Sequence, residues 1–493
     1  MQRRFINIII VIFIGAIIVA GGLFILKRHR APISEERPGI VIPEFGKREE
    51  FKPGNENASE RITIQAGREI ELNFLQGFLH GVTYNAAEDN TKTVELISAL
   101  RPQFWRLSNY SNNIYEFVTN EAKLPQRFGT KITFVLQDAF NNKYGSPVTV
   151  SSSCSERGCF SSFNELKSAW TTYLDTVMSE ITRQNLKIEY FDVFNEPHYG
   201  WSGVKPNEFL ELFKIAHDTV RKYQPSAKIV ALSLGDIENN PNSFSAAFTL
   251  FLDFVVKNDL RLDAVSWHEF AAPEDIVGRV NLMKKLFSER PQLCSPACPE
   301  IHINEYASPE SHLIPGVTAG WLYYMEKAGV NQAHRACWDT RDSQSGKEWS
   351  DCWDGFNGIL LEDNITPQNL YWVHQSYASL AKGKRLRIET NKTRTVALAS
   401  RDDEAKEMEI ILGRYGYQGN KSDVAIKIES WPYGSEKVSA KIWKIPTNNN
   451  QPLALQAPIS IAPQTFPVTN GNISIALSAV ADGEVYYLTL RPK

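Results

Sequence analysis

Eight short apolar segments alternate with longer amphipathic segments between residues 73 and 385, and this alternation constrains the fold more than any other feature of the chain. The short segments have the length and the β-branched and aromatic content of buried strands. They cover residues 81–84, 104–107, 132–136, 190–194, 229–233, 264–267, 301–304 and 332–336. Eight strand–helix units predict an α/β fold, a closed (β/α)8 TIM barrel, rather than a doubly wound sheet.

The segments between the strands carry apolar residues at the three- and four-residue steps of amphipathic helices. The clearest helix is expected from Ser161 to Leu186. Further helices are expected near residues 92–100, 206–223, 243–257, 274–288, 317–328 and 367–382. No G-x-G-x-x-G motif follows the first predicted strand, so the sequence gives no support for a dinucleotide site.

After residue 385 the hydrophobic period changes to two, which is typical of half-buried strands. The strand-like runs are residues 395–399, 408–412, 424–428, 438–443, 473–477 and 485–490. We therefore expect a barrel domain at residues 61–385 and a small antiparallel β-sandwich at residues 386–493. Residues 61–72 read as a strand and a turn ahead of the barrel, and they can pair with the sandwich.

The N-terminal region contains an apolar segment at residues 5–26, in which Asn7 is the only strongly polar residue. At a helical rise of about 1.5 Å per residue, this segment is long enough for a hydrocarbon core of about 30 Å. We predict a transmembrane helix within residues 1–30. The alternative is a cleaved signal peptide, because Ala20-Gly21-Gly22 resembles a cleavage site. Residues 31–60 are rich in proline and charge and read as a stalk.

The six cysteines fall into three close pairs, which predicts three local disulfides. Cys154 is paired with Cys159, Cys294 with Cys298, and Cys337 with Cys352. Disulfides persist outside the cytosol, so we expect the body of the protein on the extracytoplasmic side of the membrane, or secreted if the leader is cleaved. No cysteine pair has a histidine pair at zinc-finger spacing, and we expect no metal and no cofactor.

Two predicted strands end in a glutamate. The fourth ends in Phe194-Asn195-Glu196-Pro197 and the seventh in Ile303-Asn304-Glu305-Tyr306. In a (β/α)8 barrel the chemistry is located where the strands end, so the two carboxylates should face one cleft. Cleavage of a glycosidic bond needs such a pair, one protonated to donate to the leaving oxygen and one ionised to attack the anomeric carbon.

These strand ends resemble the catalytic signature of glycoside hydrolase clan A. The phrases FNEPHYGW (194–201), VSWHEF (265–270) and INEYAS (303–308) are similar to family 39, the β-xylosidase and α-L-iduronidase family. The resemblance extends from residue 80 to about residue 385, and a β-sandwich after the barrel is usual in that family.

The resemblance implies a role for each matching residue. Glu196 would be the general acid/base and Glu305 the nucleophile of a retaining hydrolysis. Asn195 would hydrogen-bond the sugar 2-hydroxyl. Arg106, at the end of the second strand, would keep the nucleophile ionised. His268, after the sixth strand, is expected to donate a hydrogen bond near Glu305 or to a sugar hydroxyl.

Aromatic rings offer flat apolar faces on which a pyranose ring can pack. We expect Trp338, after the eighth strand, to be the main platform, with the Cys337–Cys352 disulfide bracing its loop. Further rings are expected on loops of the same face, at Trp201, Trp267, Tyr306, Trp349 and Trp353. Trp105, Trp321 and Trp372 are expected in the core.

The function that the sequence predicts is a membrane-anchored retaining glycoside hydrolase acting on an oligo- or polysaccharide. A transglycosylase with the same site and a non-catalytic carbohydrate-binding protein are the alternatives. The 53 basic and 56 acidic residues nearly balance, to a net charge of −3, which gives no basic field for nucleic acid.

Overall fold

The computed structural model describes residues 48–80, 90–108, 122–136, 162–197, 205–235, 241–341, 348–352 and 354–493. Residues 41–493 form one compact unit. The predicted membrane helix, Trp201 and Trp353 lie outside the described residues, as does the side chain of Trp349. Within these ranges no helix is both long and apolar enough to cross a membrane.

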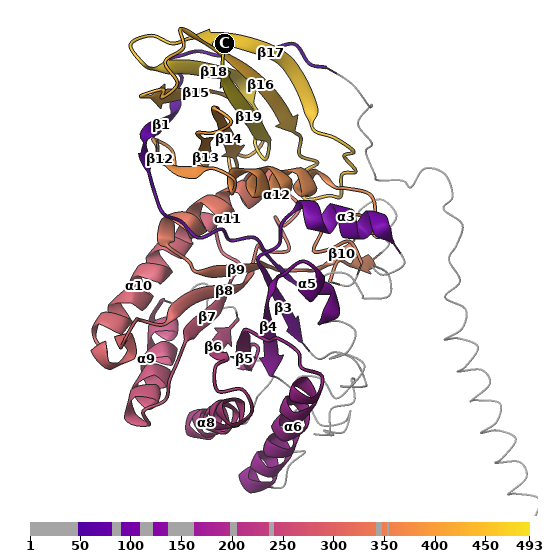
Figure 1. Cartoon of the computed structure of the whole chain (residues 1–493), viewed down its shortest axis with the longest axis vertical. Helices are drawn as coiled ribbons and strands as arrows, with labels where there is room; N and C mark the ends of the chain where they lie inside the picture. Colours follow the sequence, from indigo (N-terminus) through magenta and orange to yellow (C-terminus); the bar gives the residue numbers. More distant parts are fainter. Residues whose placement is uncertain are drawn as a thin grey trace, which may run out of the picture. The chain divides into compact units, whose positions relative to one another are not determined.

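Eight parallel strands follow one another in chain order and close into a barrel, which confirms the predicted (β/α)8 fold (Figure 1). The strands are β2 (Gly77–Leu79), β3 (Phe104–Ser108), β4 (Lys131–Leu136), β5 (Tyr190–Val193), β6 (Lys228–Leu234), β7 (Ala264–Glu269), β8 (Glu300–Tyr306) and β9 (Gln332–Arg335). The barrel closes where Phe78 of β2 pairs with Arg335 of β9.

The first strand begins earlier in the chain than the prediction of residues 81–84. Its first residue, Gly77, contributes no side chain to a hydrophobic pattern, so the pattern does not reveal the strand. A Cβ at Gly77 would lie 2.0 Å from the carbonyl oxygen of Ala333, which explains why glycine occupies this point of closure.

Helices cover the barrel at the predicted positions. They are α3 (Thr91–Ala99), α6 (Phe163–Arg183), α8 (Pro206–Tyr223), α9 (Pro241–Lys257), α10 (Ile276–Ser288), α11 (Pro315–Ala328) and α12 (Asn369–Leu380). The short α5 (Lys123–Arg127) and the 3-10 turns η3 (Pro273–Asp275) and η4 (Pro291–Cys294) were not predicted. Pro206 heads α8 at a position where its missing N–H costs no hydrogen bond.

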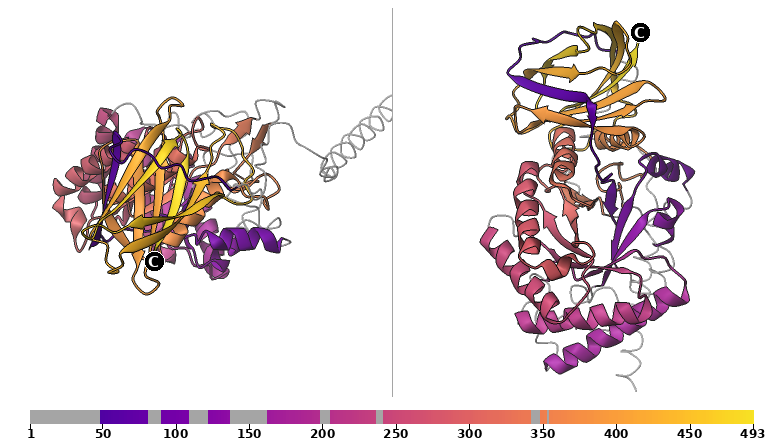
Figure 2. Two further views of the ribbon diagram at one scale, coloured as in Figure 1. Left: turned by 90° about the horizontal axis from the view of Figure 1, so that it is seen from above. Right: turned by 60° about the vertical axis from the view of Figure 1, so that its left-hand side comes forward.

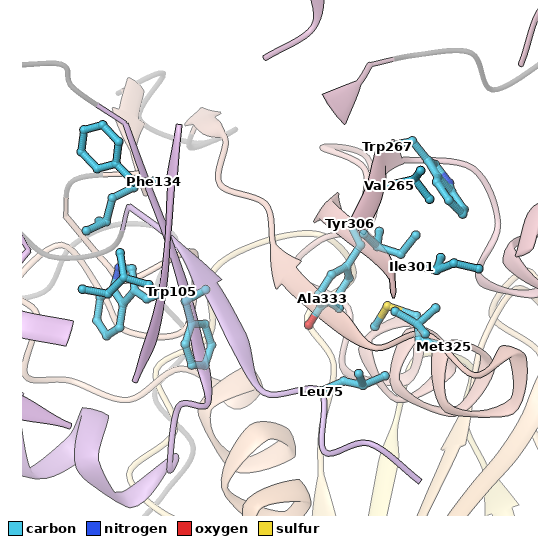
Figure 3. Close-up of a cluster of buried hydrophobic side chains, with 14 of the residues drawn as sticks. Leu75, Trp105, Phe134, Val265, Trp267, Ile301, Tyr306, Met325 and Ala333 are labelled. Atoms are coloured by element: carbon cyan, nitrogen blue, oxygen red, sulfur yellow. The ribbon is translucent and has the colours of Figure 1, made fainter. Parts of the chain in front are cut away.

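Apolar side chains between the strands and helices form the main core (Figure 3). Trp105 and Trp321 are fully buried, as predicted, and Trp372 packs on the core while remaining half-buried. The expectation that Trp267 lies on a loop of the functional face is wrong. Trp267 points outward from β7 and packs edge-on against Phe244 of α9, with 1% of its surface exposed.

The second domain is one nine-stranded sheet that curls around its own apolar core, as seen in the right-hand view of Figure 2. Its order is β17-β16-β19-β14-β13-β12-β1-β15-β18. The bounds are β1 (Glu60–Glu69), β12 (Lys384–Thr390), β13 (Thr395–Asp402), β14 (Glu407–Arg414), β15 (Ser422–Glu429), β16 (Lys437–Ile445), β17 (Ile459–Pro467), β18 (Ile473–Val480) and β19 (Val485–Pro492).

The predicted pairing of residues 61–72 with this domain is confirmed, because β1 lies between β12 and β15. The sheet is not purely antiparallel, since β1 runs parallel to β15. Two strands, β12 and β17, were not predicted. β17 is an edge strand that contains Pro463 and Pro467 and buries almost none of its residues, so it carries no clear period-two signal.

Residues 48–60, which we expected to belong to a stalk, lie along the sandwich instead. Glu49 forms an isolated parallel β-bridge with Ile461, and its side chain accepts a 2.6 Å hydrogen bond from the Lys444 ammonium. Phe51 packs edge-on against Phe466 at 5.9 Å. The sandwich therefore draws on a segment that precedes the barrel as well as on the C-terminal residues.

Helix α11 joins the two domains through small residues. A Cβ at Gly316 would lie 2.2 Å from the carbonyl oxygen of Arg414 in β14, and one at Gly320 would lie 2.5 Å from the ring of Tyr415. Glycine at these positions lets the helix backbone approach the sheet. An ion pair of 2.7 Å between Glu274 and Arg394 closes the same interface.

Two of the three predicted disulfides, Cys294–Cys298 and Cys337–Cys352, are confirmed. The first closes the loop before β8, at the N-terminal rim of the barrel. The second joins the two residues that flank the hairpin of β10 (Asp339–Arg341) and β11 (Glu348–Ser350), in the segment between β9 and α12.

The third predicted disulfide, between Cys154 and Cys159, is not among the bonds that the structure describes. Cys154 lies outside the described residues, and Cys159 does too. The bond between Cys154 and Cys159 therefore stays a prediction, which rests on their close spacing alone. Peptide mapping under non-reducing conditions should recover the two cysteines in one linked fragment, and two alkylated thiols at these positions would contradict the pairing.

Candidate active site

The two predicted carboxylates both lie at the C-terminal rim of the barrel. Glu196 follows β5 and Glu305 is the penultimate residue of β8. Their side chains are 22% and 15% exposed, so both are anchored in the rim and both can reach a ligand.

A bulge in β8 directs Glu305 inward. Trp267 of β7 pairs with Ile303, but the next residue of β7, His268, pairs with Glu305, so Asn304 is an extra residue in the strand. A bulge of this kind changes the direction of the side chains that follow it. It places Glu305 on the inner side of the strand, opposite His268.

The same bulge explains why Tyr306 does not line the site. Tyr306 was predicted to bind substrate, but it lies among the buried apolar side chains of the core (Figure 3). Its ring packs against Trp321 of α11. Burial raises the pKa of its hydroxyl to about 12, so the group stays protonated within the core. We correct the prediction: Tyr306 is a core residue.

Five residues at the C-terminal ends of barrel strands have backbone angles in the left-handed region. They are His80 (φ 46°), Phe194 (φ 76°), Glu196 (φ 45°), Ser233 (φ 49°) and Ala307 (φ 81°). Each such residue costs about 1–3 kcal/mol and persists where the surrounding structure holds it, which is common at functional sites.

Arg106 of β3 links the residues predicted for the site. Its Nε donates to Asp192 Oδ2 at 2.9 Å, its Nη1 donates to Glu305 Oε1 at 2.9 Å, and its Nη2 donates to Asn195 Oδ1 at 2.6 Å. The guanidinium is only 1% exposed. Arg106 therefore pairs directly with Glu305 and binds the Oδ1 end of the Asn195 amide.

A buried polar network, joined to Arg106 through Asp192, was not predicted from the sequence. Asp192 of β5 accepts hydrogen bonds from Ser233 Oγ at 2.7 Å and from Asn304 Nδ2 at 2.6 Å, and Ser233 Oγ lies 2.9 Å from Ser266 Oγ. All four residues are buried. An aspartate inside the apolar strand Tyr190–Val193 was the available signal, because a buried carboxylate requires partners.

His268 of β7 stands between the two glutamates, but within the described residues its ring forms no hydrogen bond with Glu305, so the predicted donor role stays a prediction. Its Nδ1 lies 3.0 Å from Glu196 Oε1 and its Nε2 lies 3.6 Å from Glu305 Oε1. Its side chain is fully buried. The imidazole is therefore hydrogen-bonded to Glu196 and lies next to the carboxyl group of Glu305.

His80, which follows β2, is a second histidine that the sequence analysis missed. Its backbone N–H donates to the carbonyl oxygen of Arg106 at 3.0 Å, and its own carbonyl oxygen accepts from Trp105 Nε1 at 2.8 Å. Burial and the nearby charge of Arg106 lower the pKa of His80 to about 3. The ring is therefore neutral near pH 7 and adds no positive charge to the site.

Trp338 lies where the sequence predicted a platform. It follows β9, its Nε1 donates to the carbonyl oxygen of Ala307 at 2.9 Å, and its ring stands edge-on to Phe270 at 5.0 Å. Phe270 in turn lies 5.8 Å from the ring of His268. Trp338 is half-buried, so part of its ring surface can reach a ligand at this rim.

The Cys337–Cys352 disulfide and Asp351 hold the backbone of Trp338. Asp351 is fully buried and its Oδ1 accepts a 2.5 Å hydrogen bond from the Trp338 N–H. Asp351 also lies 3.2 Å from the His312 Nε2. The disulfide keeps the segment that carries Asp351 beside Trp338.

We expect the double variant Cys337→Ser/Cys352→Ser to lose activity by about tenfold or more, because a platform displaced by about 1 Å misplaces the substrate. The double variant Cys294→Ser/Cys298→Ser is the matched control, since its disulfide lies at the opposite rim of the barrel. Steady-state kinetics of the two proteins would test the role, and equal losses would show that only general stability is affected.

Gly235, immediately after β6, sets the position of Glu196. A Cβ at Gly235 would lie 2.2 Å from Glu196 Oε1 and 2.7 Å from its Cδ. The backbone N–H of Glu196 donates to the carbonyl oxygen of Ser233 at 2.9 Å, so the two strand tips are held together. No sequence pattern identified this glycine.

We expect Gly235→Ala to lower kcat/KM by about 10²-fold by displacing the Glu196 carboxyl, without a matching loss of stability. The φ angle of Gly235 lies outside the left-handed region, so an alanine backbone fits there. Gly278→Ala in α10 is the control, because a Cβ there meets no atom within 4 Å. Kinetics and thermal unfolding would be measured together. Unchanged kinetics in Gly235→Ala would contradict this role.

One grouping in the described part of the chain resembles a metal site. Ligand atoms of Cys337, Asp351 and Cys352 lie within 4.8 Å of one another. The two cysteines are bonded to each other, so neither offers a thiolate ligand. With the two cysteines oxidised to a disulfide, these three residues do not form a metal-binding donor set.

The structure thus brings Glu196, Glu305, Asn195, Arg106 and His268 together at one rim, with Trp338 close by. It excludes Tyr306 from that rim. Two partly exposed carboxyl groups, one paired with a permanent cation and both in contact with one imidazole, can supply one anionic and one protonated oxygen to a ligand.

Comparison of the whole fold with solved structures finds close likeness at low sequence identity. N2152 from Neocallimastix frontalis is 18% identical with a TM-score of 0.67, over 88% of this chain and 100% of that one. The GH39 enzyme from Xanthomonas axonopodis pv. citri is 13% identical with a TM-score of 0.62, over 88% of this chain and 97% of that one.

A monomeric β-xylosidase from Caulobacter crescentus CB15 is 12% identical with a TM-score of 0.59, over 88% of this chain and 100% of that one. No protein-family model and no curated protein sequence matches the chain. At these identities the likeness concerns the fold. The resemblance to glycoside hydrolases of clan A and family 39 is confirmed at that level.

Proposed function

We propose that this protein is a glycosidase that cleaves O-glycosidic bonds with retention of configuration. The observation that carries the proposal is the placement of Glu196 and Glu305 on the two sides of His268, with Arg106 bonded directly to Glu305. The shared fold with a GH39 enzyme and a β-xylosidase supports the same class of reaction.

In the first step, Glu196 transfers its carboxyl proton to the glycosidic oxygen while the bond from that oxygen to the anomeric carbon breaks. A Glu305 oxygen attacks the anomeric carbon and forms an ester, and the leaving group departs as an alcohol. Arg106 suits this assignment because its permanent charge pairs with the carboxylate that must attack as an anion.

In the second step, Glu196, now a carboxylate, takes a proton from water. The water oxygen attacks the anomeric carbon, and the ester bond breaks and restores the Glu305 carboxylate. Two attacks at one carbon give net retention. The Nδ2 group of Asn195 is available to donate to the sugar 2-hydroxyl, a contact that strengthens as positive charge develops on the ring.

The experiment that tests the function is hydrolysis of a panel of aryl glycosides, beginning with the β-xyloside, followed by NMR of the first product formed. Release of a sugar with retained configuration would support the proposal. An inverted product would make Glu305 a general base instead. Transfer of the sugar to added acceptor rather than to water would identify a transglycosylase, and no turnover of any glycoside would favour a binding protein.

The proposal includes a membrane anchor at residues 5–26 and a catalytic body on the extracytoplasmic side. The Cys294–Cys298 and Cys337–Cys352 disulfides support the external placement. We expect deletion of residues 1–30 to release active protein from the membrane fraction. Continued membrane association of the shortened chain would contradict the anchor.

A further inference from the structure

A groove of about 430 Å³ lies between the barrel and the sandwich, away from the proposed active site. Its barrel wall is formed by the end of α3, where Arg101 precedes β3, and by α12. Residues that precede a barrel strand lie at the N-terminal rim, whereas the two carboxylates lie at the C-terminal rim. The groove is therefore a separate feature.

One face of α12 is directed to this groove. Trp372, Gln375 and Ser379 recur at three- and four-residue steps, and Lys382 follows in the same direction just after the helix. The remaining faces of the helix carry buried residues such as Val373 and Tyr377. The face with Trp372, Gln375 and Ser379 therefore lines the groove, with Trp372 half-buried against the core.

The sandwich wall presents two aromatic rings. Trp443 of β16 and Tyr487 of β19 are cross-strand partners whose rings stack at 5.4 Å with an angle of 26°. Both are half-buried, and their neighbours Ile442 and Leu488 point to the opposite side, into the sandwich core. A rigid aromatic pair next to Trp372 suits the C–H face of a sugar ring.

The orientation of Tyr487 is fixed by a hydrogen bond to an acid that does not itself line the groove. Its hydroxyl donates to Glu409 Oε1 at 2.7 Å, and the Ser379 hydroxyl donates to the same oxygen at 2.7 Å. The carboxylate is therefore already bonded from both walls, and Glu409 does not line the groove.

The groove carries an excess of positive charge. Arg101 and Lys382 are both exposed, and within the described residues neither forms an ion pair. The Arg101 guanidinium donates one hydrogen bond in the described part of the chain, to the carbonyl oxygen of Ala378 at 3.3 Å. Two cations beside three aromatic rings complement a ligand that combines apolar ring faces with carboxylate groups.

We infer that this groove is a second carbohydrate-binding site, which takes a uronic-acid-containing saccharide by stacking on Trp443 and pairing with Arg101 and Lys382. The choice of a saccharide rather than another anion with flat apolar faces rests on the proposed function. A site of this kind would hold an acidic chain against the protein at a distance from the residues that cleave it.

Binding of a galacturonic acid hexamer to the full chain carrying Glu305→Gln tests the inference, because this background prevents turnover. We expect calorimetry to show a site that weakens at least tenfold in Trp443→Ala and in Lys382→Glu, and that weakens with added salt. Lys285→Glu, an exposed lysine on α10, should leave binding unchanged. Lys382→Glu alters no core contact, so it reports on the groove even if Trp443→Ala lowers stability.

Three results would overturn the inference. The first is that the hexamer does not bind. The second is that both groove variants bind it as tightly as the Glu305→Gln parent does. The third is that the parent binds cellohexaose, which has hydroxymethyl groups instead of carboxylates, as tightly as the hexamer. In the Glu305-containing protein, both groove variants should hydrolyse a small aryl glycoside at the unaltered rate. Because binding is measured without turnover, a failure of the proposed hydrolysis would leave the groove site standing, and the reverse also holds.

Discussion

Glu305→Ala should reduce glycoside hydrolysis by at least about 10⁴-fold with every substrate, because it removes the group that forms the covalent intermediate. Activated leaving groups should not rescue the reaction. Glu305 is 15% exposed and bonded to Arg106, so the loss also leaves a buried guanidinium with one partner fewer. Thermal unfolding should be measured beside the kinetics to separate the two effects.

Added azide distinguishes a missing nucleophile from general damage. In Glu305→Ala, azide can enter the space of the lost carboxylate and attack the anomeric carbon directly, which gives a glycosyl azide of inverted configuration. Glu310→Ala, an exposed acid in the loop after β8, is the matched control and should retain full activity. Wild-type rates in Glu305→Ala would exclude the assignment.

Glu196→Ala should behave differently, with losses that depend on the leaving group. A general acid contributes about 10²–10⁴-fold, and that contribution matters most where the departing oxygen is basic. We therefore expect alkyl glycosides to lose about 10³-fold or more and activated nitrophenyl glycosides far less in their first step. Azide should accelerate the second step here and give a product of retained configuration.

The measurement is a plot of log kcat/KM against the pKa of the leaving group for the wild type and for Glu196→Ala. A much steeper dependence in the variant would support the acid/base role. Parallel lines would contradict it and would return Glu196 to a binding role. Gly235→Ala should give an intermediate slope, because the Glu196 carboxyl is present but displaced.

The barrel could be predicted from sequence because its signals are local. Buried parallel strands are short apolar runs and their covering helices repeat apolar residues every three or four positions, so each element identifies itself. The strand tips followed from the same pattern, which placed Glu196 and Glu305 at one rim before any contact was known. The exceptions in the barrel domain were the short β2, which begins with a glycine, and the one-turn helix α5. In the second domain they were β12 and the edge strand β17, which bury few of their residues.

The direction of side chains near the site could not be predicted in the same way. A regular strand would have placed Asn304 and Tyr306 on one face and Glu305 on the other. The bulge at Asn304 moves Glu305 to the inner face and turns Tyr306 outward against Trp321. A bulge adds one residue without changing the composition of the strand, so the apolar pattern does not report it.

The sequence by itself determined the order of strands and helices, the change to a second β-rich domain and the pair of strand-end glutamates, because these depend on spacing along the chain. The tertiary structure decided which groups meet across the barrel. Arg106, Asp192, Asn195 and Glu305 come from three different strands and the segment after one of them, and only barrel closure brings them within hydrogen-bonding distance. The role of Gly235 also depends on the tertiary structure. Glycine is needed there because the Glu196 side chain, at the neighbouring strand tip, occupies the space that a Cβ would take.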